Sequence, residues 1–140
     1  SGPVIVRRSA DNGASWDTPN PAFGLDDGLK IDSFDLDVDP GGQLLLTVPL
    51  RAGSGFGSSS NLYLATSIDR GQRFALGPAL EDGQGEFPNI STQFHPRTAV
   101  ASGPGGPRAV VIWGDDRNSQ NQIWSTRVDL DGAAPTAPAS

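Results

Sequence analysis

Residues 9–16 read SADNGASW and residues 67–74 read SIDRGQRF, so both stretches follow the pattern S-x-D-x-G-x-x-W/F. Gly13 and Gly71 can adopt a positive φ without steric cost, which a tight reversal of the chain requires. Asp11 and Asp69 can accept hydrogen bonds from backbone N–H groups a few residues further along. The pattern therefore predicts the same turn between paired strands twice, 58 residues apart from Ser9 to Ser67. We call these stretches the first and second aspartate turns.

Short strands joined by turns account for the rest of the sequence. It contains 18 glycines and 12 prolines among 140 residues, and no stretch has helical periodicity over more than two turns. A Pro-Gly-Gly turn at 40–42 recurs at 104–106. A fixed repeat of this kind is typical of a propeller or a solenoid. About nine strands are expected, one of them after the second aspartate turn and the others near residues 4–8, 15–17, 34–38, 43–50, 61–66, 97–102, 108–113 and 122–128.

The two aspartate turns resemble the Asp-box, also called the BNR repeat, of sialidase-like β-propellers. The resemblance implies an all-β fold of antiparallel four-stranded blades, with about nine strands in two to three blades near residues 3–30, 31–80 and 94–132. The strands would be grouped as two, then four, then three. The aromatic side chain that ends each motif is expected to fold back and bury one face against the hairpin or the next blade. The residues with structural roles would be Ser9, Asp11, Gly13, Trp16, Ser67, Asp69, Gly71 and Phe74.

Propellers usually contain four to eight blades, so nine strands cannot close a ring. The rest of a parent chain, or further copies of this chain, would be needed to complete the propeller. The sequence starts in the middle of a blade, which favours a fragment or a processed piece. Residues 133–140 are rich in alanine and proline and are expected to be a tail or linker.

Residues 110–118 read VVIWGDDRN and residues 122–127 read QIWSTR. They are similar to a hairpin that is common in secreted bacterial BNR-type proteins. One interpretation is that an aspartate and an arginine form an ion pair that orders the loop. The other is a polar contact with a ligand, with a tryptophan as a stacking surface for a sugar. The candidate ligand-binding residues are Trp113, Asp115, Asp116, Arg117 and Trp124.

The net charge is −6, with a single lysine and nine scattered arginines. Nucleic-acid surfaces need clustered basic residues, so nucleic acid is not an expected partner. The sequence has no cysteine, which excludes disulfides and thiol chemistry. No run of 18 apolar residues is present, so no membrane span is expected. From the resemblance, we expect a secreted or extracellular protein.

Sialidases of the resembled family use an arginine triad, a Tyr–Glu nucleophile pair, an aspartate acid/base and an F/Y-R-I-P motif. That motif is absent here, and the only tyrosine, Tyr63, has no obvious glutamate partner because Glu81 and Glu86 lie in a glycine-rich loop. A pair of carboxylates suited to glycoside hydrolysis cannot be placed from the sequence. No catalytic residue is therefore predicted, and an enzyme activity, if present, would be that of a sialidase-type glycoside hydrolase.

Four aspartates at positions 32, 35, 37 and 39 suggest a calcium site, because calcium prefers several oxygen ligands. Asp35, Asp37 and Asp39 would share one face of a regular strand. The alternative is a solvated strand edge whose charges prevent edge-to-edge pairing. The sequence lacks the glutamate and glycine of an EF-hand loop, so no cofactor is predicted and calcium remains the alternative.

These patterns predict a structural or ligand-binding part of a secreted bacterial Asp-box propeller, whose ligand is a glycan or a protein. The loops at 19–30, 51–60, 81–93 and 114–121 would carry recognition. A second interpretation is a fragment of an exo-acting glycosidase whose catalytic residues lie mostly outside this chain. A third is a self-assembling extracellular subunit, in which open strand edges pair between copies.

Overall fold

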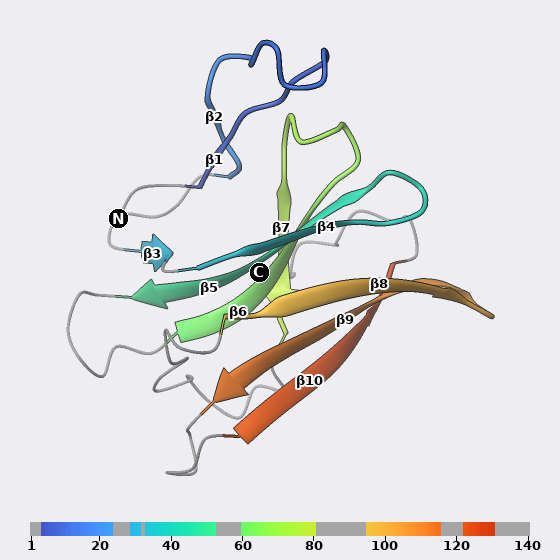
Figure 1. The fold of residues 1–140 in the computed structure, drawn as a ribbon. Helices are drawn as coiled ribbons and strands as arrows, with labels where there is room; N and C mark the ends of the chain where they lie inside the picture. Colours follow the sequence, from blue (N-terminus) through green and yellow to red (C-terminus); the bar gives the residue numbers. More distant parts are fainter. Residues whose placement is uncertain are drawn as a thin grey trace, which may run out of the picture.

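The computed structural model describes residues 4–23, 29–31, 33–52, 60–80, 95–115 and 122–130. Within these ranges all secondary structure is β, and every strand pair is antiparallel (Figure 1). The all-β prediction is thus confirmed. The same ranges hold no helix that could cross a membrane. The strands are β1 (Ile5–Val6), β2 (Asn20–Pro21), β3 (Leu29–Ile31), β4 (Asp35–Val38), β5 (Leu44–Ala52), β6 (Ser60–Ser67), β7 (Ala75–Ala79), β8 (Arg97–Gly103), β9 (Gly106–Asp115) and β10 (Gln122–Asp129).

The strands form three sheets. The first sheet contains β1 and β2, the central sheet contains β3 to β7, and the third sheet has the order β10-β9-β8. β3 and β4 pair with opposite ends of β5 and lie along the same side of it, so together they occupy the place of a single strand. Counted in this way, the three sheets are two, four and three strands wide. This grouping agrees with the sequence analysis. The expected strand at 15–17 is absent, because the return strand β2 begins only at Asn20.

A proline explains why the strand opposite β5 is divided. Pro49 lies within β5 and pairs with Leu62 of β6. On the other side of β5, the β3 pairing stops at Leu50 and the β4 pairing starts at Thr47. Proline has no N–H to donate to a neighbouring strand, and a continuous ladder on that side would leave a carbonyl without its donor. The interruption between β3 and β4 therefore falls where β5 cannot complete the ladder.

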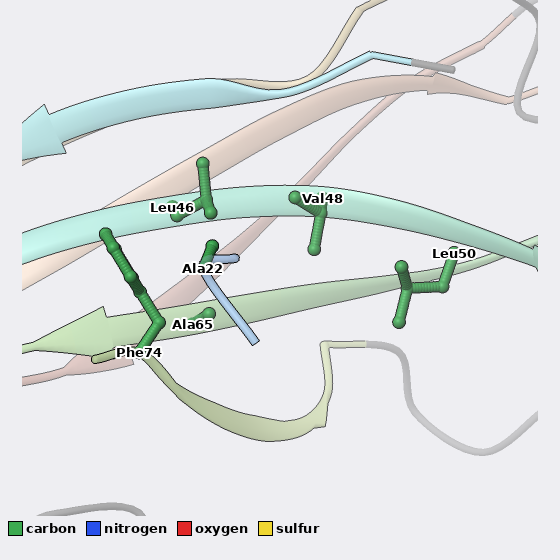
Figure 2. Close-up of a cluster of buried hydrophobic side chains, with 6 residues drawn as sticks. All are labelled: Ala22, Leu46, Val48, Leu50, Ala65 and Phe74. Carbon is green, nitrogen blue, oxygen red and sulfur yellow. The ribbon is translucent and has the colours of Figure 1, made fainter. Parts of the chain in front are cut away.

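The middle strands of the central sheet, β5 and β6, are buried on both faces. Leu46, Val48 and Leu50 of β5 project to one side, where they meet Ala22 from the first sheet (Figure 2). Leu45 projects to the other side and packs with a second cluster made of Leu64, Ala109 and Leu130. Figure 1 accordingly shows the first, central and third sheets as successive layers. A nearly continuous apolar run in β5 is what a strand covered on both faces requires.

The third sheet has one covered and one open face. Its inner face contributes Ala109 and Val111, which are fully buried against the central sheet. The alternate residues of β9, Val110 and Ile112, are 38% and 42% exposed. Ile123 of β10 lies on the same side and is 70% exposed. We call this the outer face of the third sheet.

Leu45→Ala should reduce the free energy of unfolding by about 2–5 kcal/mol, because it removes a fully buried side chain between two sheets and leaves a cavity. Leu36→Ala is the matched control, since the Leu36 side chain is 54% exposed on β4. Urea unfolding followed by circular dichroism measures both changes. An equal loss in the two variants would contradict this packing of the central sheet.

Candidate functional site

The first aspartate turn is held by side-chain hydrogen bonds around Asp11. The Ser9 hydroxyl donates to Asp11 Oδ1 at 2.7 Å and accepts from the Gly13 N–H, also at 2.7 Å. The Ser15 N–H donates to Asp11 Oδ1 at 2.8 Å. Gly13 has φ +89° and Asn12 has φ +57°, so two successive residues are left-handed. Each polar residue of the motif thus closes part of the turn.

The second aspartate turn repeats these contacts. The Ser67 hydroxyl donates to Asp69 Oδ1 at 2.8 Å and accepts from the Gly71 N–H at 2.9 Å. The Arg73 N–H donates to Asp69 Oδ1 at 3.0 Å. A Cβ added at Gly71 would lie 3.2 Å from Leu44 Cδ1, and the residue has φ +80°, so both conformation and packing favour glycine there.

These hydrogen bonds lower the pKa of both aspartates. Donation by the Ser15 hydroxyl and N–H, and then by the Ser9 hydroxyl, lowers the pKa of Asp11 from 3.8 to about 2. The Arg73 N–H, followed by the Ser67 hydroxyl, lowers the pKa of Asp69. A carboxylate stabilised in this way is a poor proton donor at neutral pH. The two aspartates therefore serve the turns as acceptors and are unsuited to general acid catalysis.

Since the folded pKa of Asp11 lies below its ordinary value, the ionised carboxylate stabilises the folded state. That contribution is present above pH 3.8 and should be lost as the pH falls toward about 2. Replacement by asparagine, Asp11→Asn, should flatten the dependence of the unfolding midpoint on pH within this window. Denaturation scans of both proteins between pH 2 and pH 5 measure this slope. An unchanged slope in Asp11→Asn would contradict the assignment.

The terminal aromatic residues of the two motifs have different environments. Phe74 is 8% exposed and belongs to the cluster between the first and central sheets, where its N–H donates to the Ala22 carbonyl at 3.1 Å. Trp16 is 59% exposed. Phe74 is thus a core residue, whereas the Trp16 ring lies near Gly13 of its own turn with more than half of its surface exposed. Phe74 packs among Ala22, Leu46 and Ala65, whereas Trp16 stays more than half exposed at the end of its turn.

Trp16 lines a cleft of about 770 Å³ between the two aspartate turns. Arg8 and Asp17 lie in this cleft and form an ion pair of 2.7 Å between Nη2 and Oδ2. Asp17 also accepts from the Arg8 N–H at 2.8 Å, and these contacts lower its pKa, with the backbone N–H first and the guanidinium second. The cleft is lined by Arg8, Ser9, Ala10, Ser15, Trp16, Asp17, Gly42, Leu44, Arg70 and Gln72.

One hydrogen bond joins the two sides of this cleft. The Asn20 side-chain amide donates to the Gln72 carbonyl at 2.7 Å, so the first sheet is tied to the second aspartate turn. Arg8 and Asp17 directly flank the first motif, and opposite charges at the two ends of a predicted hairpin turn were a signal for their pairing. Nothing in the sequence indicated that Arg70 and Gln72 would face them, since that requires the packing of the two sheets.

The two tryptophans of the third sheet point into the molecule. Trp113 is 5% exposed and packs with Leu62 and Val111 between the central and third sheets. Trp124 lies opposite Trp113 across the β9–β10 pair and packs against the same cluster. Burial of Trp113 is unfavourable for sugar stacking on its ring, whereas a ligand contact by the partly buried Trp124 stays a prediction. Asp116 and Arg117, and the side chain of Asp115, lie outside the described residues, so the loop-ordering ion pair stays a prediction.

The acidic row of β4 binds backbone groups of the third sheet. Asp35 accepts from the Thr98 N–H at 2.6 Å and pairs with Arg97 at 3.2 Å. Asp37 accepts from the Val100 N–H at 3.2 Å. The interpretation as a solvated edge is therefore wrong for Asp35, whose side chain is 19% exposed. Its carboxylate joins the edges of two sheets.

Asp39 has a third role, since it accepts from the Gln43 N–H at 2.8 Å and so closes the turn between β4 and β5. Within the described ranges no group of three or more His, Cys, Asp or Glu side chains is arranged to hold a metal ion. Asp32 lies outside those ranges. Calcium binding by Asp35, Asp37 and Asp39 stays a prediction, and it would compete with the N–H donors that these carboxylates already accept.

Asp35→Ala should lower the free energy of unfolding by about 1–3 kcal/mol, because the Thr98 N–H would lose its acceptor at a partly buried position. Asp35→Asn keeps an oxygen acceptor and should recover most of the loss. Urea unfolding gives the stability, and hydrogen exchange at the Thr98 amide reports the contact itself. Equal protection of that amide in all three proteins would contradict the role of Asp35.

Among the described residues, the tyrosine and glutamate of a sialidase-type site do not lie together. Tyr63 is half-buried beside the first core cluster, and its hydroxyl accepts from the Asn61 side-chain amide at 3.5 Å. Both glutamates, Glu81 and Glu86, lie outside the described residues.

No family model matches this sequence, and a search of curated proteins finds no significant match.

Proposed function

We propose that this chain is a structural and ligand-binding part of a secreted bacterial Asp-box β-propeller. The observation that supports the proposal most directly is the equivalence of the two aspartate turns. In each, a serine hydroxyl donates to the aspartate and accepts from the N–H of a left-handed glycine. The turns precede strands of two adjacent sheets, as expected for one turn in each blade of a propeller.

The outer face of the third sheet supports the need for a further sheet. Val110 and Ile112 of β9 stand 64 residues after Leu46 and Val48 of β5. In the central sheet these positions are buried, with exposures of 2% and 0%, beneath the first sheet. In the third sheet the equivalent side chains are 38% and 42% exposed. We infer that another sheet covers them, from the rest of a parent chain or from another copy.

A binding role agrees better with the described residues than a catalytic role. The cleft between the aspartate turns combines an exposed aromatic ring with charged groups. The proposed ligand is accordingly a glycan or a protein, which this chain binds without catalysing a reaction.

The isolated chain should self-associate through the outer face of the third sheet. Ile123→Lys places a charge on this face and should reduce the mass measured by light scattering during size-exclusion chromatography, because an ammonium group is costly to bury. Ile68→Lys is the matched control, since Ile68 is 79% exposed in the second aspartate turn.

A discrete oligomer of the unmodified chain would favour completion of the propeller by copies. Polydisperse association that Ile123→Lys relieves would favour completion by the rest of a longer chain. A monomer at all concentrations, with the same mass in both lysine variants, would contradict the proposal that a further sheet covers the outer face.

A further inference from the structure

We infer that the cleft between the aspartate turns is a saccharide site in which a pyranose ring stacks on Trp16. The inference rests on the proposed ligand-binding role and names the ligand class. The site lies between the first and central sheets, where the two aspartate turns come together. It is distinct from the hairpin of Trp113 and Trp124, for which the sequence suggested sugar stacking.

The hydrogen bonds that close the first aspartate turn do not involve the indole ring of Trp16. The first aspartate turn is closed by Ser9, Asp11 and Gly13, and the equivalent ring of the second motif, Phe74, is buried. Trp16 nevertheless has a defined place, since a Cβ added at Gly13 would lie 4.0 Å from its Cζ2 atom. A flat apolar surface that is held at a turn and is 59% exposed suits the C–H face of a pyranose.

Polar side chains line the cleft beside this ring and can serve as hydrogen-bond partners for the hydroxyl groups of a saccharide. Two hydrogen bonds from Arg8, one from Nε at 2.7 Å and one from the N–H at 2.8 Å, fix the carboxylate of Asp17. The ion pair leaves both side chains partly exposed, 40% for Arg8 and 35% for Asp17. Donors and acceptors held in this way can exchange hydrogen bonds with sugar hydroxyls at little cost in side-chain entropy.

Arg70 and Gln72 complete the opposite wall of the cleft. Both side chains are exposed, and Arg70 forms no ion pair with any residue that the structure describes. Arg8 and Asp17 neutralise each other, so Arg70 leaves one positive charge in the cleft. A saccharide with a carboxylate should therefore bind at least as well as a neutral one.

The size of the cleft favours a saccharide over a protein surface. Its volume of about 770 Å³ lies within the range of about 300–1,000 Å³ that is usual for small-molecule sites. Protein partners instead bury roughly 800 Å² on each side and usually need several aromatic or apolar anchors. Trp16 is the single aromatic residue among those that line this cleft.

The test is calorimetric titration of the full chain with two probes, a cello-oligosaccharide as the neutral saccharide and an oligogalacturonate as the acidic one. We expect at least one probe to bind. Trp16→Ala should weaken that binding roughly tenfold or more, as truncation of a central tryptophan does at other binding sites. Trp16→Phe keeps an aromatic face and should recover part of the affinity.

Two further variants make the test specific. Arg70→Ala should weaken the acidic probe while leaving the neutral probe nearly unchanged. Phe34→Ala removes an aromatic ring that is 54% exposed and does not line the cleft, so it should bind both probes like the unmodified chain. The unfolding midpoint of each variant, measured by circular dichroism, excludes loss of the fold as the cause.

The inference is overturned if neither probe binds, or if Trp16→Ala binds as tightly as the unmodified chain. Binding of a protein partner that is lost in Trp16→Ala, with no binding of either saccharide, would assign the cleft to a protein and would equally overturn it. Failure here is distinct from failure of the proposed propeller role, because the light-scattering test uses Ile123 on the far side of the third sheet.

Discussion

Burial of both faces of β5, in the middle of the central sheet, is the constraint on which the rest of this structure depends. Residues 45–48 are consecutive in β5, and each is at most 2% exposed. Because successive side chains of a strand point to opposite faces, such a run cannot be buried by one neighbour. The first sheet must cover one side and the third sheet the other. The first sheet, with only two short strands, would not be stable without this packing.

Carboxylates connect the same layers by a different interaction. Asp11 and Asp69 accept hydrogen bonds within a turn, whereas Asp35 and Asp37 accept them from the edge strand β8 of the third sheet. In each case a backbone N–H that would otherwise be left without a partner receives a charged acceptor. The excess of acidic residues in this chain is thus partly a structural requirement. The acidic row on β4 is explained without a metal ion.

The two aspartate turns show how similar motifs can acquire different roles. Their polar residues make equivalent hydrogen bonds, because those bonds are local and depend on residues within four positions of each other. Their aromatic residues differ, because the burial of a ring depends on what lies beside the turn. Phe74 became part of the core, and Trp16 remained at the surface of a cleft that also contains Arg8 and Asp17.

Local patterns in the sequence were sufficient for the all-β class, for most of the strands and for the two repeated turns, but they placed a loop at 19–30, where β2 and β3 lie, and a strand at 15–17, where there is none. These features depend on glycines that accept a positive φ, on side chains that bond to nearby N–H groups, and on the alternation of apolar residues. Only the tertiary structure decided which aromatic rings are exposed, why Asp35 is partly buried, and that Arg70 faces Arg8 and Asp17 across a cleft. Those properties arise from contacts between segments up to 63 residues apart, and no local pattern encodes which faces will meet.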